Sequence, residues 1–478
     1  MMGILVYREA IVPRMYHGLA SRRIDMPQSL SLGLYFSEDQ QVGYINLHTA
    51  PEERAEEKGY VLSANGRVEF PLFGQETRLQ LTGTAWMSAV SGLREFDFHL
   101  NAADHEMRIV GTVREGMVDA ALHTAGEIVP FKLPVGRELL LSGSLGLNAA
   151  SLPRLLPGEV AFVDAFDPTT MSVGRAKIEA LRYETLQVAG EPQETIVVAT
   201  TISGITTRAW VSREEEIIRA ETPFGLIIKR VDPREAAGPL HPDKTADMVR
   251  RLAIKAAGPE PDPGADSLRL RITGIDEVLM PPQDTRQRKT GDEWLIVRQD
   301  PKDSTLSEPF SGSDMDLYLG SDMFIQTAHP RIQELAREIV GRAENPWGNA
   351  VRIHDWVYAN IAKESVLSVP SALTVLEVRK GDCNEHAVLF TALARAAGIP
   401  TRIAIGLVWS PALASFGYHA WPEVYVGRWM AMDPTFGECT ANPTHIKLFT
   451  GGIDQWPRLM AYIGAIRLEI LEDRQPPV

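Results

Sequence analysis

The chain is poor in cysteine. Of its 478 residues, 2 are cysteines, Cys383 and Cys439. Two thiols cannot build the disulfide framework that supports small secreted domains, so each acts as a thiol or as half of one bridge. Scarcity of cysteine does not fix the compartment, because large exported proteins also do without disulfides.

Long apolar runs and basic clusters are missing as well. No stretch approaches the roughly 18 apolar residues of a membrane span, and residues 1–8 lack the apolar core of a signal peptide. Asp and Glu (62) outnumber Lys and Arg (48), which gives a formal net charge of −14. Such a chain repels phosphate backbones, and the isolated basic stretch at 286–289 is interpreted as solvated surface. We therefore expect no nucleic-acid partner, no membrane span and no export leader.

The first half of the chain is rich in predicted strands. Short alternating runs at 96–100, 107–113, 195–202 and 206–211 are separated by turn residues, as at 64–66 and 190–192. This spacing predicts a curved antiparallel sheet or half-barrel. A short or kinked helix is expected at 145–156 and an amphipathic helix at 243–257, so the β-rich region is assigned to residues 1–257.

The second half changes from strands to helices. Three prolines between residues 258 and 264 predict a linker over 258–266. A short β segment and connector are expected over 267–324, with a strand at 268–272 pairing with 294–297. Helices are predicted at 332–340, 347–361 and 383–397, followed by strands at 401–408, 419–426 and 429–433. Helices followed by strands indicate an α+β domain, here over 325–472.

Cys383 is placed where a helix start can activate a thiol. Asp382 is a predicted N-cap, and Glu385, three residues later, completes a capping box. Cys383 then occupies the first helical position, where free backbone N–H groups and the helix dipole favour a thiolate. A buried structural cysteine is the competing interpretation, and the cysteine with its cap does not decide between them.

His419 and Asp433 complete a candidate triad. His419 begins an alternating strand, and a neutral imidazole near a thiol can accept its proton. Asp433 follows the next strand, and a carboxylate there can fix the tautomer of the imidazole. A two-residue turn at 427–428 would place Asp433 on the wrong face of the sheet, so we predict a three-residue loop or a bulge between the strands.

Three blocks of this chain resemble the transglutaminase-like superfamily: residues 381–387, 417–425 and 433–437. The resemblance implies a papain-like α+β domain in a bacterial-type multidomain protein. It assigns Cys383 as nucleophile, His419 as general base and acid, and Asp433 as the orienting carboxylate. It implies acyl transfer or hydrolysis on amide bonds of protein or peptide substrates, with no cofactor and no metal.

The backbone N–H of Cys383 is one expected oxyanion donor. The second donor is not assigned, because Trp347 and Trp356 fit core packing equally well. Three alternatives for the site carry less weight. They are a zinc site at Cys383, His386 and His419, Glu423 in place of Asp433, and Cys439 as a redox partner of Cys383 rather than an inert thiol.

Two questions of role and place stay open at this point. A binding or scaffold protein that keeps the fold without turnover is the alternative to an enzyme. Residues 210–225 resemble the closing strands of half-barrel envelope proteins, which implies a binding or presentation role and a periplasmic or envelope setting. Without that resemblance, the missing leader would place the chain in the cytoplasm.

Overall fold

The computed structural model divides the chain into two compact units. The first runs to Ala246, apart from Leu72–Gln75, and the second contains Asp247–Val478. Each unit is described by itself. The structure describes residues 26–472 except for 55–56, 73–74, 103–104, 125, 137–138, 142–154, 168–170, 189, 203–204, 214–215, 223–224, 237, 239, 241–247, 302–314, 343–344, 365–369, 453–454, 456–457 and 460.

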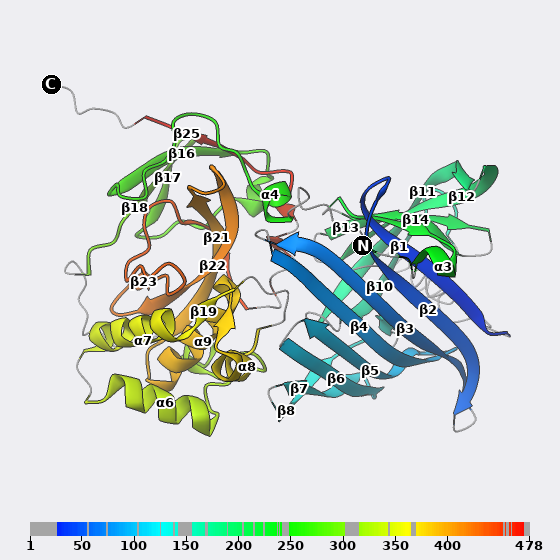
Figure 1. Ribbon diagram of the computed structural model, residues 1–478, viewed down its shortest axis with the longest axis horizontal. Coiled ribbons are helices and arrows are strands. Elements are labelled where there is room, and N and C mark those ends of the chain that lie inside the picture. Colours follow the sequence, from blue (N-terminus) through cyan, green and yellow to red (C-terminus); the bar gives the residue numbers. More distant parts are fainter. Residues whose placement is uncertain are drawn as a thin grey trace, which may run out of the picture. The chain divides into compact units, whose positions relative to one another are not determined.

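The first unit is a large antiparallel sheet (Figure 1). Its strands are β1 (Gln28–Ser37), β2 (Gln40–Arg54), β3 (Glu57–Leu72), β4 (Gln75–Ser88), β5 (Gly92–Ala102), β6 (His105–Arg114), β7 (Met117–Thr124), β8 (Glu127–Pro134), β9 (Leu139–Leu141), β10 (Val160–Asp167), β11 (Ser172–Val188), β12 (Glu191–Ile202), β13 (Ile205–Ser212), β14 (Ile217–Glu221) and β15 (Ile227–Arg230). The short helix α3 (Pro233–Ala236) follows the last strand.

The sheet is curved and open rather than a closed barrel. The strand order is β4-β3-β2-β1-β15-β14-β13-β12-β11-β10-β9-β5-β6-β7-β8, and β4 also pairs with β5. At the weakest junction, the three-residue β9 pairs in parallel with β10 but meets β5 only through Gly92 and Leu139. Alternating burial along β7 shows one apolar and one exposed face, as expected of such a sheet. The predicted β-rich, curved fold is confirmed.

Individual predictions for this region had different outcomes. The strands predicted at 96–100, 107–113, 195–202 and 206–211 lie within β5, β6, β12 and β13, and Gly190 occupies a turn with φ +87°. The turn expected at 64–66 is wrong, because these residues pair with β2 inside the continuous strand β3. The helix expected at 145–156 falls almost entirely on residues 142–154, which lie outside the described residues.

The second unit combines helices with small sheets. The helical elements are α4 (Met248–Leu252), the 3₁₀ turn η4 (Glu277–Leu279), α5 (Met315–Leu319), α6 (Pro330–Val340), α7 (Pro346–Asn360), α8 (Ala372–Val378) and α9 (Cys383–Ala396). The strands are β16 (Ser267–Thr273), β17 (Gln287–Thr290), β18 (Glu293–Val297), β19 (Ala362–Lys363), β20 (Lys380–Gly381), β21 (Thr401–Ser410), β22 (Ser415–Tyr425), β23 (Trp429–Ala431), β24 (Ile446–Thr450) and β25 (Arg467–Ile470).

Two four-stranded sheets organise this unit. One has the order β23-β22-β21-β24, and the other has the order β17-β18-β16-β25. In the second sheet β18 is the partner of β16, as predicted from the sequence, with Leu268 opposite Ile296. Its outer strand β25 comes from near the C-terminus, so residues 267–297 and the end of the chain share one sheet.

The segment predicted as helix and linker is packed into this unit. Helix α4 ends at Leu252, and Ile254 then exchanges backbone hydrogen bonds with Phe416 of β22. Ala257 exchanges them with the β25 strand. The helix expected over 253–257 is therefore wrong, because these residues pair as extended chain. The boundary between the units precedes Asp247, so residues 258–266 belong to the second unit.

Helix α9 is the central helix of the second unit. It contacts α6, α7 and α8 as well as strands β21 and β22 (Figure 1). Its residues from Glu385 to Ala394 are buried, which is the pattern of a helix enclosed on every side. Because the body of α9 is fixed by this packing, its N-terminal residue Cys383 has a defined position.

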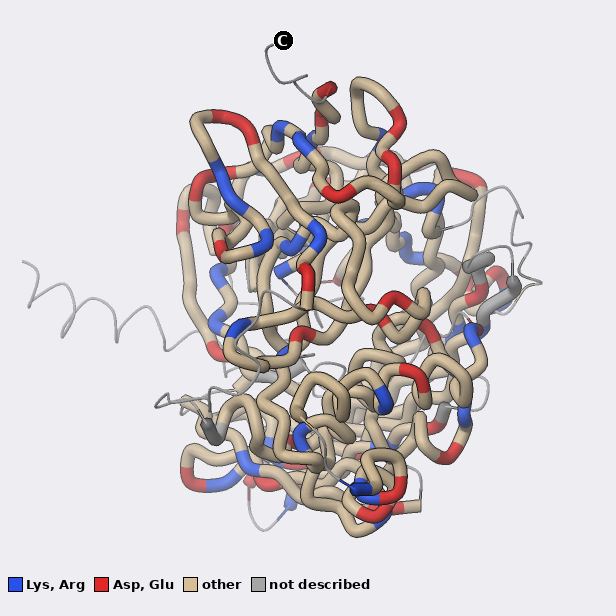
Figure 2. Tube along the Cα trace, turned by 90° about the vertical axis from the view of Figure 1, so that its left-hand side faces the viewer, with Lys and Arg blue, Asp and Glu red and all other residues tan. Residues whose placement is uncertain are grey.

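Within the residues that the structure describes, no helix is long and apolar enough to cross a membrane. Lys and Arg are interspersed with Asp and Glu along the trace rather than gathered into blocks of one sign (Figure 2). The interpretation of residues 286–289 as solvated surface is wrong, however, because Arg286 and Gln287 are buried.

Candidate active site

The start of α9 has the predicted capping box. The side chain of Asp382 accepts a hydrogen bond from Asn384 N at 2.9 Å, and Glu385 Oε2 accepts one from Asp382 N at 2.9 Å. Cys383 is the first helical residue. A Cβ at Gly381 would lie 2.3 Å from the side chain of Glu385, so the glycine makes room for the cap.

The hairpin between β22 and β23 has the predicted loop length. Tyr425 pairs with Trp429, so Val426, Gly427 and Arg428 form the loop. Gly427 has φ +89°, a left-handed conformation that favours glycine. The prediction of a three-residue loop is confirmed, and the strand register brings Asp433 to the same face as His419.

His419 and Asp433 are joined by a short hydrogen bond. His419 Nε2 lies 2.7 Å from Asp433 Oδ2, and both side chains are buried. The other carboxylate oxygen of Asp433 accepts backbone N–H bonds from Thr435 at 2.7 Å and Phe436 at 3.2 Å. Although burial opposes ionisation, the two histidines beside the carboxyl hold the pKa of Asp433 well below its usual range. Asp433 is therefore a carboxylate at neutral pH.

His445 is a second imidazole on the same carboxylate. Its Nε2 lies 3.0 Å from Asp433 Oδ2, and its side chain is fully buried. Burial lowers the pKa of His445, with Asp433 acting in the opposite direction. Its other ring nitrogen, Nδ1, lies 3.2 Å from the carbonyl oxygen of Asn442, so the ring is held at both nitrogens.

A buried arginine holds the loop that carries His445. Arg286 donates from Nη1 to the carbonyl oxygen of His445 and from Nη2 to that of Asn442, each at 2.6 Å. Burial lowers the pKa of Arg286 to about 10, so the guanidinium is charged at neutral pH. Arg286 acts on the site indirectly, by positioning His445 against Asp433.

Cys383 lies against β22 at the residue after His419. Its thiol is half-buried and receives a backbone hydrogen bond from Ala420. Burial, with Asp382 and further acidic neighbours, raises the pKa of the Cys383 thiol well above its ordinary value. The expected thiolate at the helix start is thus corrected: the capping carboxylate that orders the helix also disfavours negative charge on the sulfur.

The arrangement needs a base to ionise the thiol. Because Nε2 of His419 is engaged by Asp433, Nδ1 is the ring nitrogen left to accept a proton. Phe436 stacks on the His419 ring with centroids 4.8 Å apart and an interplanar angle of 3°, and this shields one ring face from water. A thiol, an oriented imidazole and a buried carboxylate form a set capable of nucleophilic acyl chemistry.

Several residues weighed from the sequence have structural roles instead. Glu423 accepts hydrogen bonds from Lys447 at 2.6 Å and Arg402 at 2.8 Å, so it is part of a buried ion-pair group rather than the partner of His419. His386 Nδ1 contacts the carbonyl oxygen of Asp382 at 2.7 Å and braces the start of α9. Trp356 stacks under the guanidinium of Arg379.

Two groups of side chains in the described part of the chain have the donor atoms for a metal ion. They are His419, Asp433 and His445, and His354, Asp355 and Cys439. In the first group both imidazoles approach the same oxygen through Nε2, which is the geometry of N–H donors to a carboxylate. A metal ion would need the lone pairs of those nitrogens, so this group is explained by hydrogen bonding.

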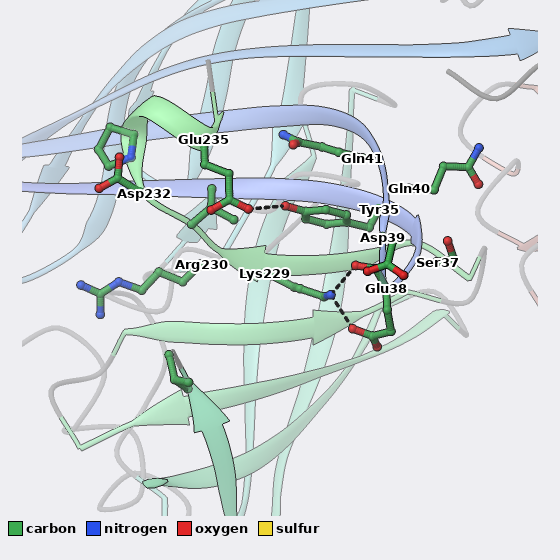
Figure 3. A pocket seen from close by; sticks show the side chains of 13 residues that line it. Tyr35, Ser37, Glu38, Asp39, Gln40, Gln41, Lys229, Arg230, Asp232 and Glu235 are labelled. Carbon is green, nitrogen blue, oxygen red and sulfur yellow. Dashed lines mark hydrogen bonds and ion pairs between the residues drawn. The ribbon is translucent and has the colours of Figure 1, made fainter. Parts of the chain in front are cut away.

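The first unit contains an open hollow that carries no comparable chemistry. It has a volume of about 1080 Å³ and lies beside β1, β2 and β15 (Figure 3). Lys229 pairs with Glu38, and Tyr35 donates to Glu235 at 3.3 Å. Burial and Glu235 raise the pKa of Tyr35 to about 12. The thiol, imidazole and carboxylate described above all lie in the other unit.

Sequence reasoning missed His445 and Arg286. His445 precedes the short strand β24, whose residues 446–449 are all buried although one of them is Lys447. Arg286 acts through backbone carbonyl groups about 160 positions away, so no local pattern connects the two. The sequence signal for this turn is an Asn followed three residues later by a His, Asn442 and His445, and it is a weak one.

Comparison with known families identifies the segment that holds this site. Residues 333–434 match the family model of the transglutaminase-like superfamily. This segment therefore belongs to that superfamily, as the three sequence blocks predicted. Cys383, His419 and Asp433 lie within it, whereas His445 and Arg286 lie outside.

Individual relatives are distant. An uncharacterised protein of Haemophilus influenzae is 37% identical over 100 residues, which are 20% of this chain and 27% of that protein. The chain thus spans about a quarter of the length of this curated relative. A candidate cysteine protease from Cytophaga hutchinsonii has 18% identity and a TM-score of 0.31, over 44% of this chain and 90% of that structure. A β-barrel-like protein from Brucella abortus, a domain of unknown function, has 10% identity and a TM-score of 0.30. The match covers 43% of this chain and 95% of that chain.

Proposed function

We propose, from the premise that residues 333–434 are a transglutaminase-like segment, that this protein is an enzyme. Its proposed reaction is thiol-dependent acyl transfer or hydrolysis on amide bonds of protein or peptide substrates. Cys383 is the nucleophile, His419 the general base and acid, and Asp433 the carboxylate that orients His419.

The observation that carries the proposal is the hydrogen bond between His419 and Asp433 beside the thiol. The bond spans 2.7 Å between two buried side chains, and Ala420, the neighbour of His419, donates its N–H to Cys383. A carboxylate that fixes the imidazole and stabilises its charged form is the role known for such a residue in acyl transfer.

The chemistry follows from the resting state of the site. The raised pKa keeps Cys383 protonated, so His419 Nδ1 accepts the proton as the sulfur attacks the amide carbonyl. The first N–H of a helix has no intrahelical partner, so the Cys383 amide can donate to the oxyanion. His419 then protonates the leaving amine, and water or a second amine resolves the thioester.

A non-catalytic scaffold is the second candidate. One observation favours it: surroundings that raise a thiol pKa suit an inert cysteine unless a base acts on it. The deciding quantity is therefore the contribution of His419 to the reactivity of Cys383.

Alkylation by iodoacetamide at pH 7, followed by mass spectrometry of the Cys383 peptide, measures that contribution. His419→Asn is expected to slow alkylation of Cys383 by about 10²-fold, because general-base assistance is lost. Cys439→Ser is the matched control and should leave the rate at Cys383 unchanged. Equal rates in the wild type and His419→Asn would favour the scaffold.

Trapping of the acyl-enzyme then tests turnover. After incubation with cell extract, the wild type should carry an acyl group on Cys383 and Cys383→Ala should carry none. Adding a primary amine distinguishes the two fates, because cross-linking converts the thioester into an amide of that amine and hydrolysis releases a free acid. Absence of any acyl adduct under these conditions would contradict the enzyme.

A further inference from the structure

A second group of thiol, imidazole and carboxylate lies beside the turn that follows Asp433. His354 and Asp355 are on α7, and Cys439 follows that turn. His354 Nδ1 is 2.9 Å from Asp355 Oδ1 and 3.4 Å from Cys439 Sγ, and Sγ is 3.8 Å from Oδ1. All three donor atoms lie within 4.8 Å of one another. The reaction proposed above uses none of these side chains.

The contact made by the far side of His354 places a hydrogen on that side of the ring. Its Nε2 lies 3.1 Å from the carbonyl oxygen of Asp433. A carbonyl oxygen only accepts, so Nε2 carries a hydrogen. A histidine that binds a metal through one nitrogen usually donates the other N–H to a carbonyl or carboxylate in this way. The ring is buried, so this orientation is fixed.

With no second hydrogen on the ring, two electron-rich atoms face each other. With the hydrogen on Nε2, Nδ1 presents a lone pair to a carboxylate oxygen 2.9 Å away. Two acceptors at that separation repel unless a proton or a metal ion lies between them. A metal ion at this point would be held by Nδ1, the carboxylate and the sulfur together.

The spacing fits a small tetrahedral ion. Zinc bonds of about 2.0–2.3 Å to nitrogen, oxygen and sulfur place ligand atoms roughly 3.3–3.6 Å apart. The separations of 2.9, 3.4 and 3.8 Å bracket these edge lengths, so shifts of a few tenths of an ångström suffice. One nitrogen, one sulfur and one oxygen suit zinc and similar ions rather than Mg²⁺ or Ca²⁺, which require oxygen ligands.

We propose that His354, Asp355 and Cys439 bind one zinc-class divalent ion. The Asp355 side chain is 65% exposed, so the fourth ligand position faces solvent. Binding replaces the thiol hydrogen of Cys439 by the metal and releases the proton to water. The ion ties Cys439, at the end of the Asp433 turn, to helix α7.

Cobalt(II) is the probe, because a cobalt–thiolate bond gives a near-ultraviolet charge-transfer band and tetrahedral cobalt absorbs visible light. The full-length protein should show both with one equivalent of Co²⁺, and Zn²⁺ should remove them. Cys439→Ser should abolish the charge-transfer band, whereas Cys383→Ser should keep it. Asp355→Asn, at an exposed position that does not threaten folding, should weaken cobalt binding at least about tenfold.

Three results would overturn the proposal. One is the absence of a charge-transfer band in the wild type. Another is a band that survives in Cys439→Ser but disappears in Cys383→Ser, which would place the ion on the nucleophile. The third is unchanged affinity in Asp355→Asn. Circular dichroism of each variant separates a lost ligand from a lost fold, and none of these readouts depends on catalytic activity.

Discussion

At the scale of residues, the site is organised around the carboxylate of Asp433. It is fully buried and accepts hydrogen bonds from two imidazoles and two backbone amides. Such donors replace the lost hydration, which is why the charge is tolerated away from water. Removal of either imidazole would therefore leave part of the carboxylate charge without a hydrogen-bond donor.

His445 makes stability depend on pH in a defined direction. Its folded pKa is lowered by burial, so the folded ring is neutral while the unfolded ring takes up a proton near pH 6.5. The unfolded chain binds more protons below that value, and stability falls as pH decreases from about 7 toward the folded pKa. His445→Gln should flatten the pH dependence by up to about 1.4 kcal/mol per pH unit, measured by urea unfolding between pH 5 and 7.

Two comparisons frame this measurement. His386 is buried and its pKa is also lowered by burial, so part of the slope should persist in His445→Gln. The exposed His48 provides the matched control, and His48→Gln should leave the slope as in the wild type. An identical slope in His445→Gln would contradict the assignment of a neutral buried ring.

At the scale of elements, the β22–β23 hairpin shows how far sequence reasoning reaches. Strand alternation fixes which residues share a face, so the loop length followed from requiring His419 and Asp433 to meet. The capped start of α9 was equally accessible, because a capping box has a local signature. The raised pKa of Cys383 was not accessible, since it depends on burial and on carboxylates that only the folded chain brings together.

Deleting Gly427 tests the hairpin directly. The two remaining loop residues would shift the strand register by one position and turn Asp433 to the other face of the sheet. Alkylation of Cys383 should then slow at least about tenfold as His419 loses its orienting partner.

Gly427→Ala keeps the loop length and serves as the control. It should cost about 1–2 kcal/mol of stability, because alanine is strained at φ +89°, yet retain the alkylation rate of the wild type. If the deletion and the substitution alkylate equally fast, orientation by Asp433 has no part in the reactivity of Cys383.

At the scale of the whole molecule, local signals predicted the elements better than their boundaries. The prolines between 258 and 264 correctly exclude a helix there, but excluding a helix does not exclude packing. Backbone pairing of Ile254 with β22 and of Ala257 with β25 determines the place of this segment, and such long-range pairs leave no local pattern. The division into domains at 257 and 325 stays a prediction.

Two fragments test whether the segment before residue 267 is structural. Residues 247–478 include the strand pairs of Ile254 and Ala257, and residues 267–478 lack them. At roughly 1 kcal/mol per backbone hydrogen bond, the loss of these four bonds should cost the shorter fragment about 4 kcal/mol and lower its melting temperature by about 12 °C. Equal melting temperatures, measured by circular dichroism, would favour the linker predicted from the sequence.

The pairing of β16 with β25 also has a meaning for biosynthesis. Residues 267–273 leave the ribosome long before residues 467–470, and the second sheet is incomplete until both are available. At 5–20 residues per second, on the order of 10 s separates the emergence of Cys383 from that of Ile470. Translation therefore delivers Cys383 first and the strand that completes the second sheet last, so the nascent chain carries this thiol for several seconds before that sheet can form.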